Sequence, residues 1–169
     1  MSQQSPDGAG LDPVTGLCTR AGLEQHLGKE VARARRQNTA LSLATVHVEE
    51  LSRLTARCGK STVDNAMKEL ARRLKKASRG SDIAARLSDD DFLLLLPECG
   101  VNEVKQVLNR LGAIELSVSG EKTSLEYTTG WVDYQPGELP ANLLKRAADL
   151  LHLYDTAAQD SFSAALGSR

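Results

Sequence analysis

Apolar side chains recur at every third or fourth position in several stretches of the chain, which is the spacing of helices with one buried face. One such stretch follows Thr19, whose hydroxyl suits a helix N-cap. The clearest covers 61–78, where basic residues gather in the last turns. A short helical piece precedes it. We predict further helices over 101–112 and 139–160.

Shorter segments carry β-branched and apolar residues in the patterns of strands. Residues 41–49 alternate, and 82–87 and 92–96 form a hairpin. The second hairpin strand is almost all leucine, which indicates a central strand covered on both faces. Two further strands follow at 114–118 and 125–134. The order α-β-α-α-β-β-α-β-β-α predicts an α/β (α+β) fold, with helices surrounding a central five-stranded, mostly antiparallel sheet.

The length and the charge of the chain narrow the functional classes. A chain of 169 residues fits one domain, which we expect to cover 11–162, with 1–10 as a flexible lead-in and 163–169 as a flexible tail. A net charge of −1 gives no general attraction to nucleic acid or to anionic membranes. No segment approaches the roughly 18 consecutive apolar residues that span a bilayer, and the first residues lack the pattern of a signal peptide.

Three cysteines, Cys18, Cys58 and Cys99, are widely spaced and odd in number. This pattern indicates reduced thiols rather than a disulfide framework or a zinc site. We therefore expect a cytoplasmic location.

The predicted hairpin contains the sequence SDDDF at 88–92, with three aspartates and no glycine. Adjacent carboxylates repel one another unless a positive group lies among them. Two interpretations follow: the turn binds a cation, or it is a solvated acidic turn flanked by Arg86 that needs no metal. The residues favour the second interpretation.

Three segments resemble motifs of one family, the GGDEF domain, which is the catalytic module of bacterial diguanylate cyclases. The segment DPVTGLCTR at 12–20 resembles D-x-L-T-G-L-x-N-R, and CGKSTVD at 58–64 resembles Y-G-H-x-x-G-D. The segment RLSDDDF at 86–92 resembles R-Y-G-G-D-E-F. The spacings match without gaps. The resemblance implies the family's nucleotidyl-cyclase-like fold, a five-stranded sheet wrapped by helices.

In that family, an Asp at the end of the first strand and the signature hairpin hold Mg²⁺ and the triphosphate of GTP. Here His47 and Glu49 occupy the two strand-end positions, and an imidazole is a poor Mg²⁺ ligand. Ser52 and Thr55 stand where the family has a phosphate-facing Lys and an Asn that reads guanine. The resemblance therefore implies that several nucleotide contacts have been lost.

The hairpin positions have also changed. Ser88 and Asp89 replace the two glycines that let backbone and nucleotide approach closely, and a carboxylate there repels phosphate. Only Asp90 and Asp91 keep the acidic character of the motif. We predict a degenerate active site with no diguanylate cyclase activity, no catalytic residue, no cofactor and no Mg²⁺.

Asp64 survives at the position where the family places an Asp against guanine. The alternative is a structural role, because Ser61 and Asp64 form a capping-box pattern at the start of the predicted helix.

The segment RGSD at 79–82 lies five residues before the hairpin sequence, at the spacing of the R-x-x-D product-binding site of many cyclases in this family. Arg79 offers a planar fork for a guanine edge or a phosphate. Asp82 can accept from N1–H and N2–H₂ of guanine. The resemblance places Arg110 and Arg33 where such sites are completed, often from a second protomer. The alternatives are an Arg79–Asp82 pair within the chain and, for Arg33, a basic helix end.

The resemblance therefore implies a catalytically inactive GGDEF domain in bacterial second-messenger signalling that acts as a cyclic di-GMP receptor. A homodimer partner, a protein partner or a neighbouring signalling domain would receive the signal. One alternative is a nucleotide-independent interaction or dimerisation module. Another is a domain that still binds GTP through Asp64, Asp90 and Asp91.

Overall fold

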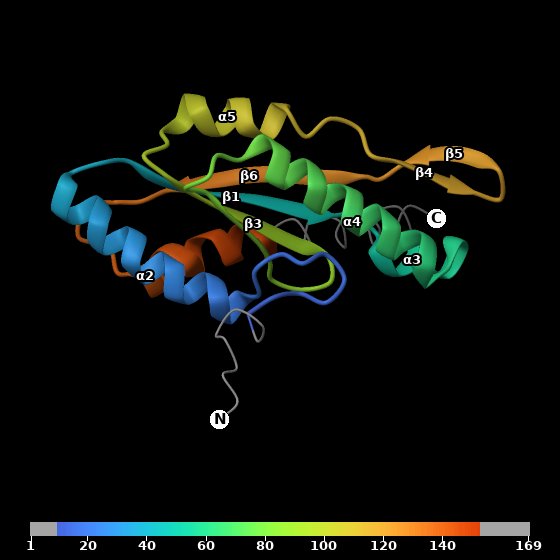
Figure 1. Ribbon diagram of the computed structural model, residues 1–169, viewed down its shortest axis with the longest axis horizontal. Helices are drawn as coiled ribbons and strands as arrows, with labels where there is room; N and C mark the ends of the chain where they lie inside the picture. Colours follow the sequence, from blue (N-terminus) through green and yellow to red (C-terminus); the bar gives the residue numbers. More distant parts are fainter. Residues whose placement is uncertain (1–9, 153–169) are drawn as a thin grey trace, which may run out of the picture.

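The structure is a computed structural model that describes residues 10–152 (Figure 1). Its elements follow in the order α2 (Arg20–Gln37), β1 (Leu41–Val48), α3 (Leu51–Cys58), α4 (Lys60–Ala77), β2 (Ile83–Arg86), β3 (Asp91–Pro97), α5 (Val101–Asn109), β4 (Glu115–Val118), β5 (Glu121–Ser124) and β6 (Tyr127–Asp133). A last helix begins at residue 140 and is described to residue 152. The expected lead-in (except Gly10), the expected tail and the end of the domain at 162 lie outside the described residues.

Four strands form the main sheet, in the order β2-β3-β1-β6, and every neighbouring pair is antiparallel. In the pairing of β1 with β3, Leu43 lies opposite Leu95 and His47 opposite Asp91. All eight residues of β1 are buried. The predicted central leucine strand is confirmed: Phe92 and the leucines after it are all buried. Because the side chains of a strand alternate between faces, such a strand needs cover on both sides of the sheet.

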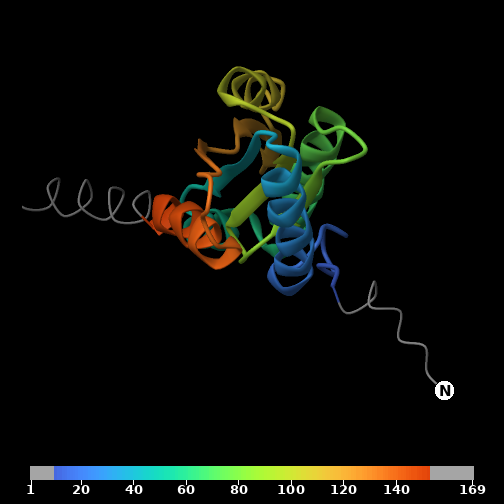
Figure 2. The same cartoon turned by 90° about the vertical axis from the view of Figure 1, so that its left-hand side faces the viewer.

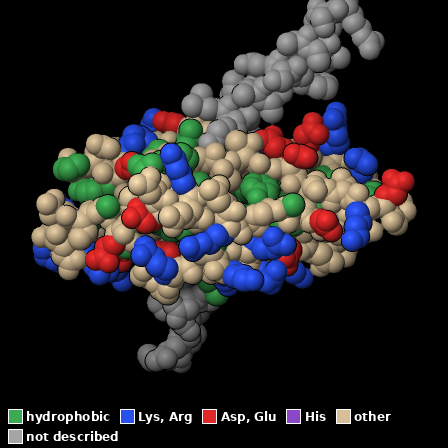
Figure 3. Space-filling model, turned by 90° about the horizontal axis from the view of Figure 1, so that it is seen from above, with side chains coloured by type: hydrophobic (Ala, Val, Ile, Leu, Met, Phe, Trp, Pro, Cys, Tyr) green, Lys and Arg blue, Asp and Glu red, His purple; other side chains and the backbone are tan. Residues whose placement is uncertain are grey.

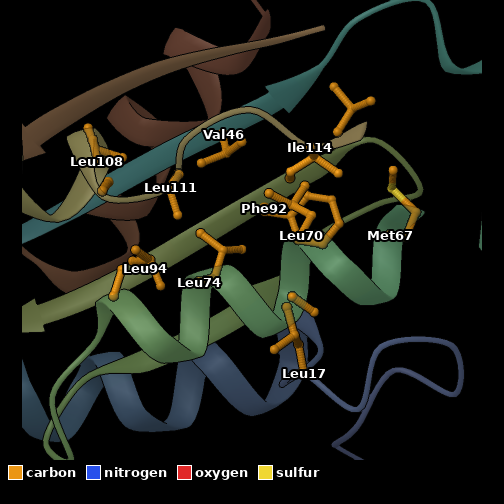
Figure 4. Close-up of a cluster of buried hydrophobic side chains, with 14 of the residues drawn as sticks. Leu17, Val46, Met67, Leu70, Leu74, Phe92, Leu94, Leu108, Leu111 and Ile114 are labelled. Carbon is orange, nitrogen blue, oxygen red and sulfur yellow. The ribbon is translucent and has the colours of Figure 1, made fainter. Parts of the chain in front are cut away.

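Helices supply that cover from two layers (Figures 1 and 2). On one face, side chains of α4 such as Met67, Leu70 and Leu74 pack against Phe92 and Leu94 of the sheet (Figure 4). The other face packs against α2 and the helix that begins at residue 140. The N-cap at Thr19 is confirmed, since its side chain accepts a hydrogen bond from the backbone of Gly22.

The strand pattern differs from the predicted five-stranded sheet. Among the described residues, four strands form the main sheet, and β4 and β5 form a separate two-stranded hairpin. The hairpin turns at Ser119 and Gly120, whose φ values of 53° and 85° are the consecutive positive values of a tight hairpin turn. The residues that follow this turn were expected to be a connection, because β5 contains only polar residues and so lacks the alternation that marks a strand.

The start of α4 also differs from the prediction. The N-cap is Gly59, so Ser61 lies inside the helix, and no side chain caps its first turn. Asp64 is instead paired with Lys60 one turn earlier, with Nζ 2.6 Å from Oδ2. The predicted capping box of Ser61 and Asp64 is therefore wrong. None of the described helices is long and apolar enough to cross a bilayer.

The face seen in Figure 3 carries Lys and Arg side chains interspersed with Asp and Glu. Several of these charges are paired along α4, where Glu69 accepts from both Arg72 and Arg73. These hydrogen bonds lower the pKa of Glu69 to about 2. Charges of both signs are therefore paired along this helix.

Candidate functional site

The turn between β2 and β3 closes without glycine. The residues 88–91 have no positive φ, so the aspartates adopt ordinary backbone conformations. The backbone of Leu87 donates to the carbonyl of Asp91 at 2.8 Å and closes the turn. The loss of both signature glycines is therefore compatible with a well-formed hairpin.

Arg86 at the end of β2 fixes this turn to the segment before α2. Its Nη2 donates to the carbonyl of Asp89 at 2.7 Å, and its Nη1 donates to Oδ2 of Asp12 at 3.2 Å. The Asp12 carboxylate also accepts from the backbone and hydroxyl of Thr15. Burial raises the pKa of Asp12, but the hydrogen bonds from Thr15 and Arg86 outweigh burial and leave its pKa lowered.

His47 lies at the end of β1 and faces the hairpin. Its side chain is only 4% exposed, and its Nδ1 lies 2.7 Å from Oδ1 of Asp91 on the neighbouring strand. The second strand-end residue, Glu49, is bound on the other side, where its carboxylate accepts from the hydroxyl of Thr128 on β6. The two residues at the family's strand-end positions thus bond to different strands: His47 to β3 and Glu49 to β6.

The carboxylates of Asp90 and Asp91 lie close to each other and to His47. The hydroxyl of Ser88 is 2.9 Å from Oδ1 of Asp90 and 3.1 Å from Oδ2 of Asp91. One ligand atom from each of His47, Asp90 and Asp91 can be chosen so that all three lie within 4.8 Å of one another. The structure therefore brings together three of the predicted active-site positions.

A pocket of about 530 Å³ opens between α3 and the turn. Its lining comes from two segments: Leu51, Ser52 and Thr55 of α3, and Ser88, Asp89 and Asp90 of the turn. Asp89 was expected to obstruct a nucleotide, but it lines this pocket rather than filling it. The described lining carries two carboxylates and no Lys or Arg.

Two other predicted positions, Thr55 and Asp64, are engaged in hydrogen bonds within their own helices. The hydroxyl of Thr55 donates to the carbonyl of Leu51 within α3, at 2.8 Å. Asp64 is not among the residues that line the pocket, and its carboxylate is paired with Lys60. The described contacts of Thr55 and Asp64 therefore lie within the chain and do not indicate a contact with guanine.

Arg79 and Asp82 flank the turn from α4 into β2. Oδ2 of Asp82 accepts from the backbone N–H of Arg79 at 2.7 Å and lies 3.8 Å from its Nε. The guanidinium donates to the carbonyl of Pro97 at 3.0 Å. The Arg79 side chain is 55% exposed, whereas the Asp82 side chain is fully buried. The predicted pairing within the chain and an accessible arginine fork are both present.

The other carboxylate oxygen of Asp82, Oδ1, is buried and has no hydrogen-bond partner among the described residues. Asp82 and Arg79 line a pocket of about 290 Å³ between the end of α4, α2 and the segment before α2. Lys75 and His26 line the same pocket. An unsatisfied buried carboxylate oxygen costs free energy, so its presence beside a pocket indicates a position for a donor.

Arg33 and Arg110 have different positions relative to Arg79. Arg33 on α2 pairs with Glu98 at 3.7 Å, next to the Pro97 carbonyl that Arg79 binds, so both arginines lie at the same end of β3. Arg110 is exposed at the C-terminal end of α5. That helix starts near Pro97 and separates Arg110 from it by roughly 13 Å along the axis. Arg33 therefore lies at the end of β3 to which Arg79 bonds, whereas Arg110 precedes Leu111, whose carbonyl accepts from Arg73 on α4.

The sequence analysis assigned no site role to Lys75 or His26, both of which line this pocket. Lys75 lies four positions before Arg79, which is one helical turn, so this spacing could have indicated a shared face. The involvement of His26 depends on how α2 packs beside the end of α4, and the sequence carries no signal for that packing.

Comparisons with known proteins agree with this fold. The family model described as "Diguanylate cyclase, GGDEF domain" matches residues 9–159. Diguanylate cyclase DgcP of Pseudomonas aeruginosa is 30% identical over 158 residues, which cover 91% of this chain and 24% of DgcP. Diguanylate cyclase DosC of Escherichia coli (strain K12) is 27% identical over 121 residues, 72% of this chain and 25% of DosC. The chain spans about a quarter of the length of these relatives.

Two solved structures share the architecture. The GGDEF domain of DgcB from Caulobacter crescentus, in complex with c-di-GMP, has a TM-score of 0.80 at 19% identity over 94% of each chain. Diguanylate cyclase SiaD of Pseudomonas aeruginosa, in complex with its activator SiaC, has a TM-score of 0.78 at 26% identity. That match covers 89% of this chain and 60% of the SiaD chain. The family match over most of the sequence and the shared fold together show that this chain belongs to the GGDEF domain family.

Proposed function

We propose that this chain is a catalytically inactive GGDEF domain that acts as a cyclic di-GMP receptor. The observation that carries the proposal is the unsatisfied Oδ1 of Asp82, buried beside the exposed guanidinium of Arg79. Guanine offers two adjacent donors, N1–H and N2–H₂, on one edge, and O6 and N7 as acceptors on another. A carboxylate acceptor and an arginine fork three residues apart complement those edges.

The surroundings of these two residues suit a charged nucleotide. Lys75 and His26 line the same pocket, and Arg33 lies at the adjacent end of β3. Cationic side chains attract the phosphates of a cyclic dinucleotide. Because Asp82 is fully buried, a base edge reaches Oδ1 only when the residues that cover it move.

Loss of catalysis is part of the proposal. Phosphoryl transfer depends on cations that neutralise the developing charge on the phosphates. The pocket between α3 and the turn instead presents Asp89 and Asp90, with no lysine or arginine in its lining. His47 occupies the first strand-end position and bonds to Asp91. These features argue against binding of a Mg²⁺-bound triphosphate there.

The position of Arg110 suggests how a signal could pass on. The resemblance places this residue where such sites are completed, often from a second protomer, and here it is exposed at the C-terminal end of α5. Cyclic di-GMP bound at Arg79 would then bridge two chains. Because the chain spans only about a quarter of DgcP and DosC, a neighbouring domain is an equally suitable recipient.

Calorimetric titration with cyclic di-GMP tests the proposal. We expect binding in the micromolar range that Arg79→Ala weakens at least about tenfold, the loss that follows removal of a bidentate arginine contact. The matched control is Arg72→Ala, an exposed arginine on α4 whose partner is Glu69, and we expect it to leave the affinity unchanged. No binding would favour a nucleotide-independent interaction module, and turnover of GTP with Mg²⁺ or Mn²⁺ would overturn the claim of inactivity.

A further inference from the structure

Three side chains that commonly bind metals converge where β1 ends and β3 begins. One nitrogen of His47 and one oxygen from each of Asp90 and Asp91 lie within 4.8 Å of one another. The pairing of β1 with β3 produces this arrangement, because it places His47 directly opposite Asp91. From the sequence alone we assigned no metal to these positions, because an imidazole is a poor Mg²⁺ ligand and the acidic turn was interpreted as solvated.

The ion that the GGDEF family implies, Mg²⁺, does not fit this set of donors. Mg²⁺ requires oxygen ligands in nearly ideal octahedral geometry and usually keeps several of its waters. Here one of the three potential ligands is the imidazole nitrogen of His47, whose side chain is only 4% exposed. Three potential metal ligands are present, but their donor atoms suit a class of ion other than Mg²⁺.

Borderline transition-metal ions accept the same donors. Zn²⁺ binds histidine nitrogen at about 2.0–2.1 Å and carboxylate oxygen at about 2.0–2.2 Å, which separates two ligands of a tetrahedral ion by about 3.3 Å. Nδ1 of His47 and Oδ1 of Asp91 are 2.7 Å apart. An opening of roughly 0.6 Å would therefore let an ion replace the proton between these two atoms.

Among the described residues, no Lys or Arg forms an ion pair with Asp90 or Asp91. Ser88 lies within hydrogen-bond distance of both Asp90 and Asp91, but its hydroxyl has one proton and cannot fully satisfy both. The guanidinium of Arg86 donates to the carbonyl of Asp89 and to Asp12 on the other side of the turn. A divalent cation would supply the missing charge, and Ser88 would then orient the carboxylates from outside the ligand shell.

We propose that His47, Asp90 and Asp91 form a binding site for a borderline divalent transition-metal ion of the class of Zn²⁺ and Co²⁺. The ion would join the end of β1 to the turn before β3. This site does not depend on the proposed cyclic di-GMP site, because Arg79 and Asp82 lie at the opposite end of β2. Either proposal can therefore fail without the other.

Titration of the full chain with Zn²⁺ in a buffer that does not chelate metals tests the site. We expect one ion per chain, retained in the presence of excess Mg²⁺. Asp90→Asn and Asp91→Asn should each weaken Zn²⁺ binding at least about tenfold, as loss of a ligand contact does. Asp89→Asn is the matched control, because it makes the same charge change in the same turn, and it should change the affinity less than about twofold.

Co²⁺ gives an independent spectroscopic measurement. We expect visible absorption bands from bound Co²⁺ that change when His47→Gln removes the nitrogen ligand. If that variant does not fold, the contrast between Asp89→Asn and Asp90→Asn decides the question. The proposal is overturned if Zn²⁺ does not bind, if Mg²⁺ competes as well as Zn²⁺, if Asp89→Asn weakens binding as much as Asp90→Asn, or if a folded His47→Gln chain keeps the Co²⁺ spectrum.

Discussion

Arg79 and Asp82 are joined twice across the turn from α4 to β2, because one carboxylate oxygen of Asp82 accepts from the Arg79 backbone and lies 3.8 Å from its Nε. The contact uses only Oδ2 and leaves Oδ1 buried without a described partner. Oδ2 therefore stabilises the turn, and Oδ1 is the acceptor that we propose binds the ligand. This division separates the structural and the binding contributions of one residue.

Substitutions at Asp82 can measure the two contributions. Asp82→Asn keeps an oxygen for the Arg79 backbone but replaces the second acceptor with a donor, so we expect at least about a tenfold loss of cyclic di-GMP affinity. Asp82→Ala removes both, so we expect the same loss of affinity and a free energy of unfolding lower by about 1 kcal/mol. Calorimetry and urea unfolding measure the two quantities. Full affinity in the Asn variant would show that Oδ1 does not contact the ligand.

Arg33 and Arg110 should differ in how they affect assembly. Arg110 is exposed at the C-terminal end of α5, and we propose that it contacts ligand held by a second chain, so Arg110→Ala should reduce dimerisation induced by cyclic di-GMP while the ligand-free chain is unaffected. Arg33→Ala should weaken binding within one chain, because Arg33 lies beside the same end of β3 as Arg79. Sedimentation velocity with and without the ligand gives the stoichiometry. Equal ligand-induced dimerisation in wild type and Arg110→Ala would exclude the bridging role.

Two glycines predict opposite effects on stability. Gly120 has φ of 85° in the turn between β4 and β5, where an alanine is strained, so Gly120→Ala should lower the free energy of unfolding by about 1 kcal/mol. Gly28 lies inside α2, with open space around an added Cβ. Gly28→Ala should therefore raise the free energy of unfolding by up to about 1 kcal/mol. Thermal unfolding of both variants checks the pair, and a shift of the same sign in both would contradict it.

Asp12 predicts a dependence of stability on pH. Its pKa in the folded chain is lowered from 3.8, because hydrogen bonds from Thr15 and Arg86 outweigh the effect of burial. A lowered pKa means that the carboxylate stabilises the fold above pH 3.8 and that this contribution is lost as the pH falls through the folded-state pKa. Asp12→Asn should cost about 1 kcal/mol at pH 7, and the difference should shrink in acid. A difference that stays constant down to pH 2 would contradict this account.

Most helices and strands could be predicted because the apolar patterns that mark them lie within single segments. The helical spacing of apolar residues after Thr19 predicted α2, where Leu23, Leu27 and Val31 are buried. The leucine run predicted β3, whose leucines are buried as well. The hairpin of β4 and β5 was missed because its second strand has no apolar residue, so a tight turn and backbone pairing alone define it. The start of α4 was misplaced because a glycine N-cap competes poorly, on sequence grounds, with a Ser–Asp capping pattern.

The candidate sites were predicted only in part, because their geometry depends on contacts between residues that lie far apart in the sequence. The motif spacing identified Arg79 and Asp82, but the free acceptor of Asp82 depends on how its side chain turns into the fold. His47, Asp90 and Asp91 were identified one by one as changed positions, whereas their convergence depends on the pairing of β1 with β3. Single candidate residues can be identified from a sequence, but the distances between them depend on how the strands pair.

The crystal structure of the chain grown with cyclic di-GMP is the most direct test of the central claim. We predict a guanine whose N1–H and N2–H₂ edge lies within hydrogen-bond distance of the Asp82 carboxylate, Oδ1 included, with the guanidinium of Arg79 against the same nucleotide. Crystals saturated with the ligand that show only water between these two side chains would contradict the claim.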